Sequence, residues 1–250
     1  MTGPWRLVDG PVGVLRTYAT ATPPGSSPGP VLMLCHELPR GRGAAADTGR
    51  TLPSLADRLA HDTGCSVVVG MLRGAGGSEG DFSGSGWLAD LAFLVDQQVG
   101  PSGSLWLAGF DLGGALALRL AASDPRVAGV ASLAAPADLA SWVADPAAAL
   151  ARCRRSGVIT TRGFPTDEAG WAEELVALKP LESVAALGGR PLLVVHGSGD
   201  DEVPTAAARA LADASEHGPV DLRIVPGAGH WLRADPRVVA TLAGWVERQR

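Results

Sequence analysis

The sequence predicts an α/β fold in which a mostly parallel central sheet is flanked by helices on both sides. Short runs rich in Val, Leu and Ile alternate along the chain with longer Ala/Leu-rich stretches of helical length. The short runs are continuously apolar rather than alternately apolar and polar, which is typical of strands buried on both faces. The composition agrees, because 46% of the 250 residues are hydrophobic and only 19% are charged.

The predicted elements follow in order along the chain. A hairpin of Trp5–Val8 and Val12–Ala19 comes first, and a Pro/Gly/Ser loop over Thr20–Pro30 follows it. Buried strands are then expected at Val31–Cys35, Cys65–Gly70, Ser104–Ala108, Val127–Ala134, Pro191–His196 and Val220–Val225. Helices are expected at Thr51–Thr63, Ser85–Val99, Gly113–Ser123, Thr205–Glu216 and Asp235–Gln249.

One stretch interrupts this alternation. Residues 137–189 contain helical segments and a Gly/Pro loop but no strong strand. An insertion of this kind is most simply a small helical lid over the carboxyl ends of the strands, where open α/β sheets bind ligands. We therefore expect a core of residues 1–136 and 190–250 with a lid of residues 137–189. The lid helices are expected at Pro146–Arg155, Asp167–Leu178 and Leu181–Leu187.

Charge and composition argue against several classes of partner. The net charge is −5 and the sequence has no basic stripe, which disfavours nucleic-acid binding. No apolar run reaches the roughly 20 residues of a membrane span, and the N-terminus lacks a secretion signal pattern, so we expect a cytoplasmic protein without membrane contact. Cys35, Cys65 and Cys153 form no metal-binding or disulfide pattern and are expected to be small buried residues.

The most informative segment is Gly109-Phe110-Asp111-Leu112-Gly113. A predicted strand leads into it and an Ala/Leu helix follows directly. Small residues around a strained central position allow its side chain to stand out at the N-terminus of a helix, which is the arrangement of a nucleophile elbow.

Four further motifs occur in a meaningful order around this elbow, and with them the sequence resembles the α/β-hydrolase family along nearly its whole length. They are His36-Glu37-Leu38-Pro39, Arg73–Gly80, His196–Pro204 and Pro226–Trp231. The resemblance implies a catalytic triad of Asp111, Asp200 and His230, in the chain order that this fold requires. It also implies an oxyanion hole made by the backbone N–H groups of Leu38 and Leu112, with no metal and no cofactor.

The chain departs from the family at Asp111, where serine is usual. A carboxylate that attacks an sp³ carbon bearing a halide or an epoxide forms an alkyl ester, which water activated by histidine can hydrolyse. The enzymes that this chain resembles open epoxides with lid tyrosines and release halides with a tryptophan after the nucleophile. Here the only tyrosine is Tyr18, and Leu112 follows Asp111. These two features argue against both activities.

A second departure is Glu37, which replaces a small glycine in the oxyanion segment. If its side chain faces Asp111, the two carboxylates should share a proton and Glu37 would be a pocket acid. A divalent-cation site of Glu37, Asp111 and His230 is a further alternative, although we expect no metal. His36 is expected to hold the oxyanion segment rather than to take part in the reaction.

Two hypotheses for the function remain open at this point. The first is a hydrolase of a small organic substrate with an ester, halide or similar bond, with Asp111 as nucleophile or general base, His230 as base and Asp200 orienting it. The second is a non-catalytic relative that binds a ligand or a partner protein. Three arginines of the lid, Arg152, Arg154 and Arg155, form either a solvated face or a receptor for an anionic substrate. The sequence does not indicate the oligomeric state.

Overall fold

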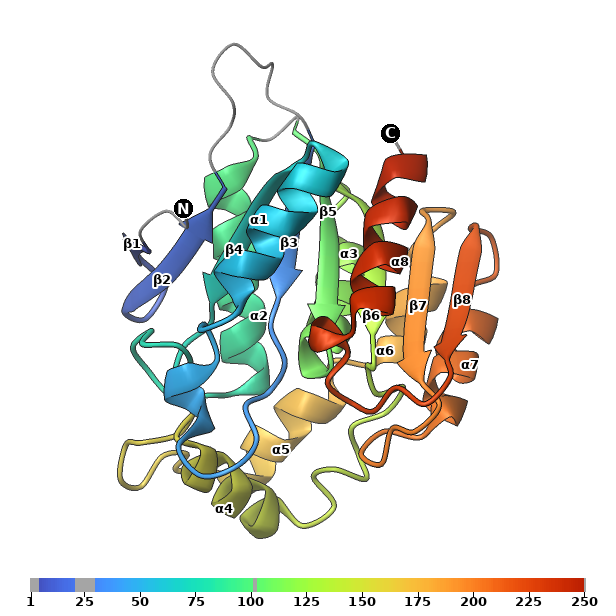
Figure 1. Cartoon of the computed structure of the whole chain (residues 1–250). Coiled ribbons are helices and arrows are strands. Elements are labelled where there is room, and N and C mark those ends of the chain that lie inside the picture. The colour runs from blue at the N-terminus through green and yellow to red at the C-terminus, as the bar shows by residue number, and fades with distance from the viewer. Residues whose placement is uncertain (1–4, 21–29, 101–102, 250) are drawn as a thin grey trace.

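The central feature of the computed structural model is an eight-stranded sheet in the order β1-β2-β4-β3-β5-β6-β7-β8 (Figure 1). The structure describes residues 5–20, 30–100 and 103–249. The first two strands form the predicted antiparallel hairpin, β2 is antiparallel to β4, and all other neighbours are parallel. The strands are β1 (Arg6–Asp9), β2 (Val14–Ala19), β3 (Val31–Cys35), β4 (Ser66–Met71), β5 (Leu105–Phe110), β6 (Val127–Leu133), β7 (Leu192–Gly197) and β8 (Val220–Val225).

Helices cover both faces of this sheet, as predicted. In Figure 1, α1 and α8 lie in front of the strands, and α2, α3, α6 and α7 lie behind or beside them. Each face has its own cluster of buried apolar side chains. These helices are α1 (Leu52–Thr63), α2 (Gly84–Gln98), α3 (Leu112–Ser123), α6 (Pro180–Ala185), α7 (Thr205–Asp213) and α8 (Pro236–Arg248), with short 3₁₀ helices at Ala44–Asp47 and Leu232–Ala234.

The predicted α/β class with a mostly parallel sheet is confirmed, and the predicted strands are found with ends shifted by a few residues. The expectation that every parallel strand is buried on both faces is wrong for β8. This strand lies at the edge of the sheet, and its Asp221 and Arg223 are partly or fully exposed and pair with each other. The predicted loop over Thr20–Pro30 lies almost wholly outside the described residues.

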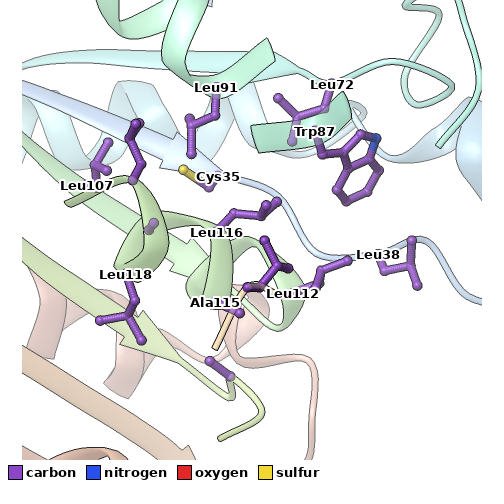
Figure 2. Close-up of a cluster of buried hydrophobic side chains, with 14 of the residues drawn as sticks. Cys35, Leu38, Leu72, Trp87, Leu91, Leu107, Leu112, Ala115, Leu116 and Leu118 are labelled. Carbon is purple, nitrogen blue, oxygen red and sulfur yellow. The ribbon is translucent and has the colours of Figure 1, made fainter. Parts of the chain in front are cut away.

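The helix that follows the elbow is packed into the centre of the molecule. Figure 2 shows Leu112, Ala115, Leu116 and Leu118 of α3 in one buried cluster with Cys35 at the end of β3. Leu38, from the segment after β3, belongs to the same cluster. The start of α3 and the segment that follows β3 are therefore held together by apolar packing, which fixes the frame of the site.

The segment 137–189 is divided between two locations. Helices α4 (Pro146–Ser156) and α5 (Glu168–Val176) pack against each other and lie beyond the end of the sheet toward which β5 runs (Figure 1). Helix α6 instead packs against α3 and α7, where Val184 is buried in the core. Within the described residues, no helix is long and apolar enough to cross a membrane.

Candidate active site

The elbow positions Asp111 in a strained backbone conformation between β5 and α3. Its φ of 52° and ψ of −125° lie in a region that L-residues rarely adopt. The chain crosses itself closely here, because a Cβ atom on Gly109 would lie 2.2 Å from the carbonyl oxygen of Gly113. A Cβ on Gly113 would lie 2.4 Å from the carbonyl oxygen of His36. The two glycines therefore permit the sharp turn that brings Asp111 against the segment after β3.

The three predicted triad residues meet at the carboxyl end of the sheet. His230 Nδ1 lies 2.9 Å from Asp200 Oδ2, and His230 Nε2 lies 3.5 Å from Asp111 Oδ1. All three side chains are almost completely buried. The first distance is a hydrogen bond, whereas the second is an ion-pair distance.

Asp200 is held rigidly by the loop after β7. Its Oδ1 accepts hydrogen bonds from the backbone N–H groups of Glu202 and Val203. Its Oδ2 lies 3.1 Å from Nε2 of the buried His196, which also contacts the Val203 carbonyl oxygen. Both carboxylate oxygens of Asp200 are fixed by these contacts. The carboxylate therefore holds the His230 ring in one orientation through Nδ1.

A backbone N–H group of the predicted oxyanion hole points at the Asp111 carboxylate. The Leu38 N–H donates to Asp111 Oδ2 over 3.3 Å, and the Leu112 N–H at the start of α3 helps to lower the pKa of this carboxylate. The N-terminus of a helix favours negative charge, so the location suits an anion. One carboxylate oxygen of Asp111 thus accepts a backbone N–H that the sequence analysis assigned to the oxyanion hole.

Arg40 is a site residue that the sequence motifs did not identify. Its Nη2 donates to Asp111 Oδ1 over 3.0 Å, and its Nη1 pairs with Glu202. Burial by itself raises the pKa of Asp111, but the interactions with His230 and with the Arg40 charge outweigh it, so this pKa is lowered. Asp111 is therefore ionised at neutral pH. The only sequence feature that could have indicated this role is the position of Arg40 directly after His36-Glu37-Leu38-Pro39.

The negative charge of Asp111 raises the pKa of His230. Burial lowers its pKa, but the Asp111 carboxylate and the hydrogen bond to Asp200 more than compensate, so the pKa of His230 is raised. The imidazolium form is consequently favoured while Asp111 carries its negative charge.

Glu37 is turned toward Arg233 and does not line the large cavity beside Asp111. Its Oε1 lies 2.9 Å from Arg233 Nη2, whereas its buried Oε2 has no hydrogen-bond partner within the described part of the chain. Burial raises the pKa of Glu37 and outweighs the opposing charge of Arg233. No shared proton with Asp111 is indicated, because no hydrogen bond joins the two carboxylates within the described residues.

His36 has a structural place, as predicted from its location. Its Nε2 accepts the backbone N–H of Leu72 over 3.1 Å, and its Nδ1 lies 2.8 Å from the Glu37 carbonyl oxygen. Burial lowers the pKa of His36 to about 4. It therefore remains neutral and connects the oxyanion segment to β4.

Asp111 lines both a large cavity and a small one. The large cavity, named here the Asp111 chamber, has a volume of about 540 Å³. It is lined by Leu38, Arg40, Asp111, Leu112, residues 136–139, 141–142 and 202–204, and the first half of α7. The small cavity has a volume of about 10 Å³, and its wall includes Glu37, Asp111, His230 and Arg233. The Asp111 chamber therefore lies against Asp111, and the small cavity next to the same side chain has room for about one water molecule.

Candidate metal ligands do not gather in this site. Within residues 5–20, 30–100 and 103–249, no group of three or more His, Cys, Asp or Glu side chains has the geometry to hold a metal ion. Two of the three groups considered as cation ligands, Asp111 and Glu37, are each paired with an arginine.

Comparisons with known proteins identify the class. The sequence matches the Alpha/beta hydrolase family over residues 32–242, so the chain belongs to this family, as its motifs predicted. A search of curated proteins finds no match to the sequence.

Solved structures of similar fold cover nearly the whole chain. Est1E from Butyrivibrio proteoclasticus, determined with ferulic acid, is 17% identical, with a TM-score of 0.68 over 98% of this chain and 97% of its own. An alpha-beta serine hydrolase homologue from Coxiella burnetii is 24% identical, with a TM-score of 0.62 over 100% and 98%. A meta-cleavage product hydrolase from Pseudomonas fluorescens is 16% identical, with a TM-score of 0.69 over 98% of both chains. At these identities the likeness supports the fold alone.

Proposed function

We propose that this protein hydrolyses a small organic substrate through a covalent ester formed on Asp111. One observation carries the proposal. The ionised Asp111 carboxylate directs Oδ2 to the oxyanion-hole N–H of Leu38, while Oδ1 lies beside Arg40 and 3.5 Å from His230 Nε2. This arrangement suits a carboxylate nucleophile, because the oxygen that does not attack already has its hydrogen-bond donors.

In the first step, Oδ1 of Asp111 attacks an sp³ carbon of a substrate bound in the Asp111 chamber. The new C–O bond forms as the bond to the leaving group breaks, and the leaving group departs with the electron pair. Arg40 lines the same chamber, with its side chain 24% exposed. Its cation can stabilise the departing anion, a role for which the motifs offered no tryptophan or tyrosine.

In the second step, the ester must be hydrolysed, and formation of that ester prepares His230 for this task. The pKa of His230 is raised by the Asp111 charge, and esterification removes that charge. The imidazolium therefore gives its proton to solvent more readily, and the neutral imidazole is then a base. Water attacks Cγ, the carbonyl carbon of the ester, Nε2 accepts a proton from this water, and the oxyanion develops on Oδ2 near the N–H groups of Leu38 and Leu112. Collapse breaks the Cγ–Oδ1 bond, and the departing oxygen takes the proton from His230 to give the product alcohol.

The small cavity supports a location for the attacking water. Its wall includes Asp111, and two buried atoms in its other wall residues, Glu37 Oε2 and His230 Nε2, have no hydrogen-bond partner within the described residues. Buried polar atoms are usually satisfied by protein or by water. Glu37 would then position the water that His230 deprotonates.

The test is intact-mass analysis after incubation with haloalkanes, epoxides and activated esters. His230→Ala should accumulate an alkyl adduct on Asp111, because the first step remains and the second is lost. Asp111→Asn should form no adduct. His217→Ala is the matched control, since this histidine is 73% exposed beside Glu216 and should leave turnover unchanged.

A second candidate function is supported by the same carboxylate. Because Asp111 Oδ2 occupies the oxyanion hole and Arg40 neutralises Oδ1, the site also resembles that of a non-catalytic relative that binds a ligand in the Asp111 chamber. Absence of both adduct and turnover across all substrate classes, together with saturable binding, would favour this second function.

A further inference from the structure

A second cavity adjoins the Asp111 chamber. It has a volume of about 520 Å³ and is named here the α4 chamber, because Arg152, Cys153, Arg155 and Ser156 of α4 line it. The two chambers share a wall of Leu38, Arg40, Ser141, Trp142 and Glu202. A ligand of modest length can therefore contact both chambers at once.

The two chambers carry opposite charge. The lining of the Asp111 chamber has one cation, Arg40, against Asp111, Asp138 and Glu202. The lining of the α4 chamber has Arg40, Arg152 and Arg155 against Glu202 alone. In a chain of net charge −5, the α4 chamber is thus a local excess of positive charge next to the nucleophile.

The Arg152 side chain is held in place, and neither Arg152 nor Arg155 is neutralised by a carboxylate within the described residues. Arg152 Nη2 donates to the Trp142 carbonyl oxygen over 2.8 Å, and its guanidinium carbon lies 5.2 Å from the centre of the Trp142 ring. The Arg155 backbone carbonyl accepts the N–H of Gly43 over 2.9 Å, which ties α4 to the loop after β3. Within the described part of the chain, neither arginine has a carboxylate within 4.0 Å.

We propose that the α4 chamber binds a carboxylate group of the substrate while the reacting carbon lies at Asp111. The guanidinium group presents donors in a fork that matches the two oxygens of a carboxylate, and charge-assisted bonds of this kind are among the strongest in proteins. The Trp142 ring between the chambers provides an apolar surface for the part of the substrate that joins the two ends. This inference rests on the proposed function for the identity of the ligand as substrate.

Equilibrium binding tests the inference without turnover. Isothermal titration calorimetry would compare straight-chain carboxylates from butanoate to hexanoate with their amides, which have the same shape and no charge. The carboxylates should bind about tenfold or more tightly than the amides. The double variant Arg152→Gln/Arg155→Gln should lose this preference and leave amide binding unchanged.

Arg154→Gln provides the matched control on the same helix. Arg154 donates to the Phe164 carbonyl oxygen and lines neither chamber, so its substitution should preserve the preference for carboxylates. Equal affinity for acid and amide in the wild type, or an unchanged preference in the double variant, would overturn the proposal.

A turnover comparison separates this inference from the proposed function. ω-Bromocarboxylates and bromoalkanes of equal length would be compared by adduct formation in His230→Ala. Adducts with both, formed without preference, would refute the carboxylate site and leave the covalent mechanism intact. Tight carboxylate binding without any adduct would refute the covalent mechanism and leave the carboxylate site intact.

Discussion

Asp111 and Glu37 are both buried carboxylates with an arginine partner, yet their pKa values move in opposite directions. Asp111 lies beside His230 and Arg40, and these two groups lower its pKa. Glu37 receives Arg233 on one oxygen, while the other has no partner within the described residues, and its pKa is raised. Two close cationic partners outweigh burial at Asp111, whereas a single arginine does not outweigh it at Glu37.

This difference suits two roles in one reaction. The carboxylate with several donors remains an anion and can attack carbon, whereas the one with an unsatisfied oxygen is able to hold water or a proton. The predictions below alter one side of the comparison at a time.

The largest effect is expected from Arg233→Leu, which leaves Glu37 buried without a counterion. Glu37 must then be protonated in the folded state. Because burial already raises its pKa in the wild type, the added loss is at most about 3–4 kcal/mol at pH 7 and about 1 kcal/mol at pH 5, since each pH unit above the unfolded pKa adds about 1.4 kcal/mol. A raised folded pKa means that stability is lost as pH rises. Urea unfolding at both pH values measures the difference.

Two controls accompany this variant. Arg58→Leu removes an exposed pair with Asp62 on α1 and should change stability by less than about 1 kcal/mol at either pH. Adding Glu37→Leu to Arg233→Leu should restore much of the loss. A pH-independent loss in Arg233→Leu would show that packing rather than charge is the cause.

An intermediate effect is expected from Arg40→Gln. Because the Arg40 charge lowers the pKa of Asp111, its removal should raise this pKa and move the acidic limb of kcat/KM to higher pH. The rate at neutral pH should fall by roughly tenfold or more. Arg40→Lys should keep the limb near its original position, and the exposed Arg42→Gln should behave as wild type. If the acidic limb of the kcat/KM profile does not move in Arg40→Gln, then Arg40 does not lower the pKa of Asp111.

The smallest effect concerns His230 and is measured by NMR titration of its ring. The negative charge of Asp111 stabilises the imidazolium, so Asp111→Asn should lower the pKa of His230. Asp201→Asn removes an exposed charge near Asp200 and should leave this pKa unchanged. An unchanged or raised value in Asp111→Asn would refute the coupling on which the second step depends.

The sequence predicted the frame of the site because its signals are local. Continuous apolar runs located the strands, and the glycines around Asp111 marked a turn that only a residue without Cβ can follow. The parallel order of these strands then directs Asp111, Asp200 and His230 to one end of the sheet. Their proximity was implied by the resemblance to the α/β-hydrolase family, and this topology agrees with it.

The electrostatic partners could not be predicted in the same way. Arg40 and Arg233 reach their carboxylates across 71 and 196 positions of sequence, and the paths of two loops decide which carboxylate each one contacts. The Glu37 side chain turns toward Arg233, so its orientation could not be predicted from the sequence either. The edge location of β8 was misjudged because an apolar run alone does not say whether a further strand lies beyond it.

The charged pairs on that last strand bear on how copies of the chain behave at high concentration. Strand β8 presents Asp221 and Arg223, and β1 at the other end of the sheet presents Arg6 and Asp9. A strand from another molecule that extended the sheet at either end would have to bury these charges or break their pairs. Both ends thus disfavour intermolecular β-pairing and aggregation, although the strands between them are among the most apolar segments of the chain.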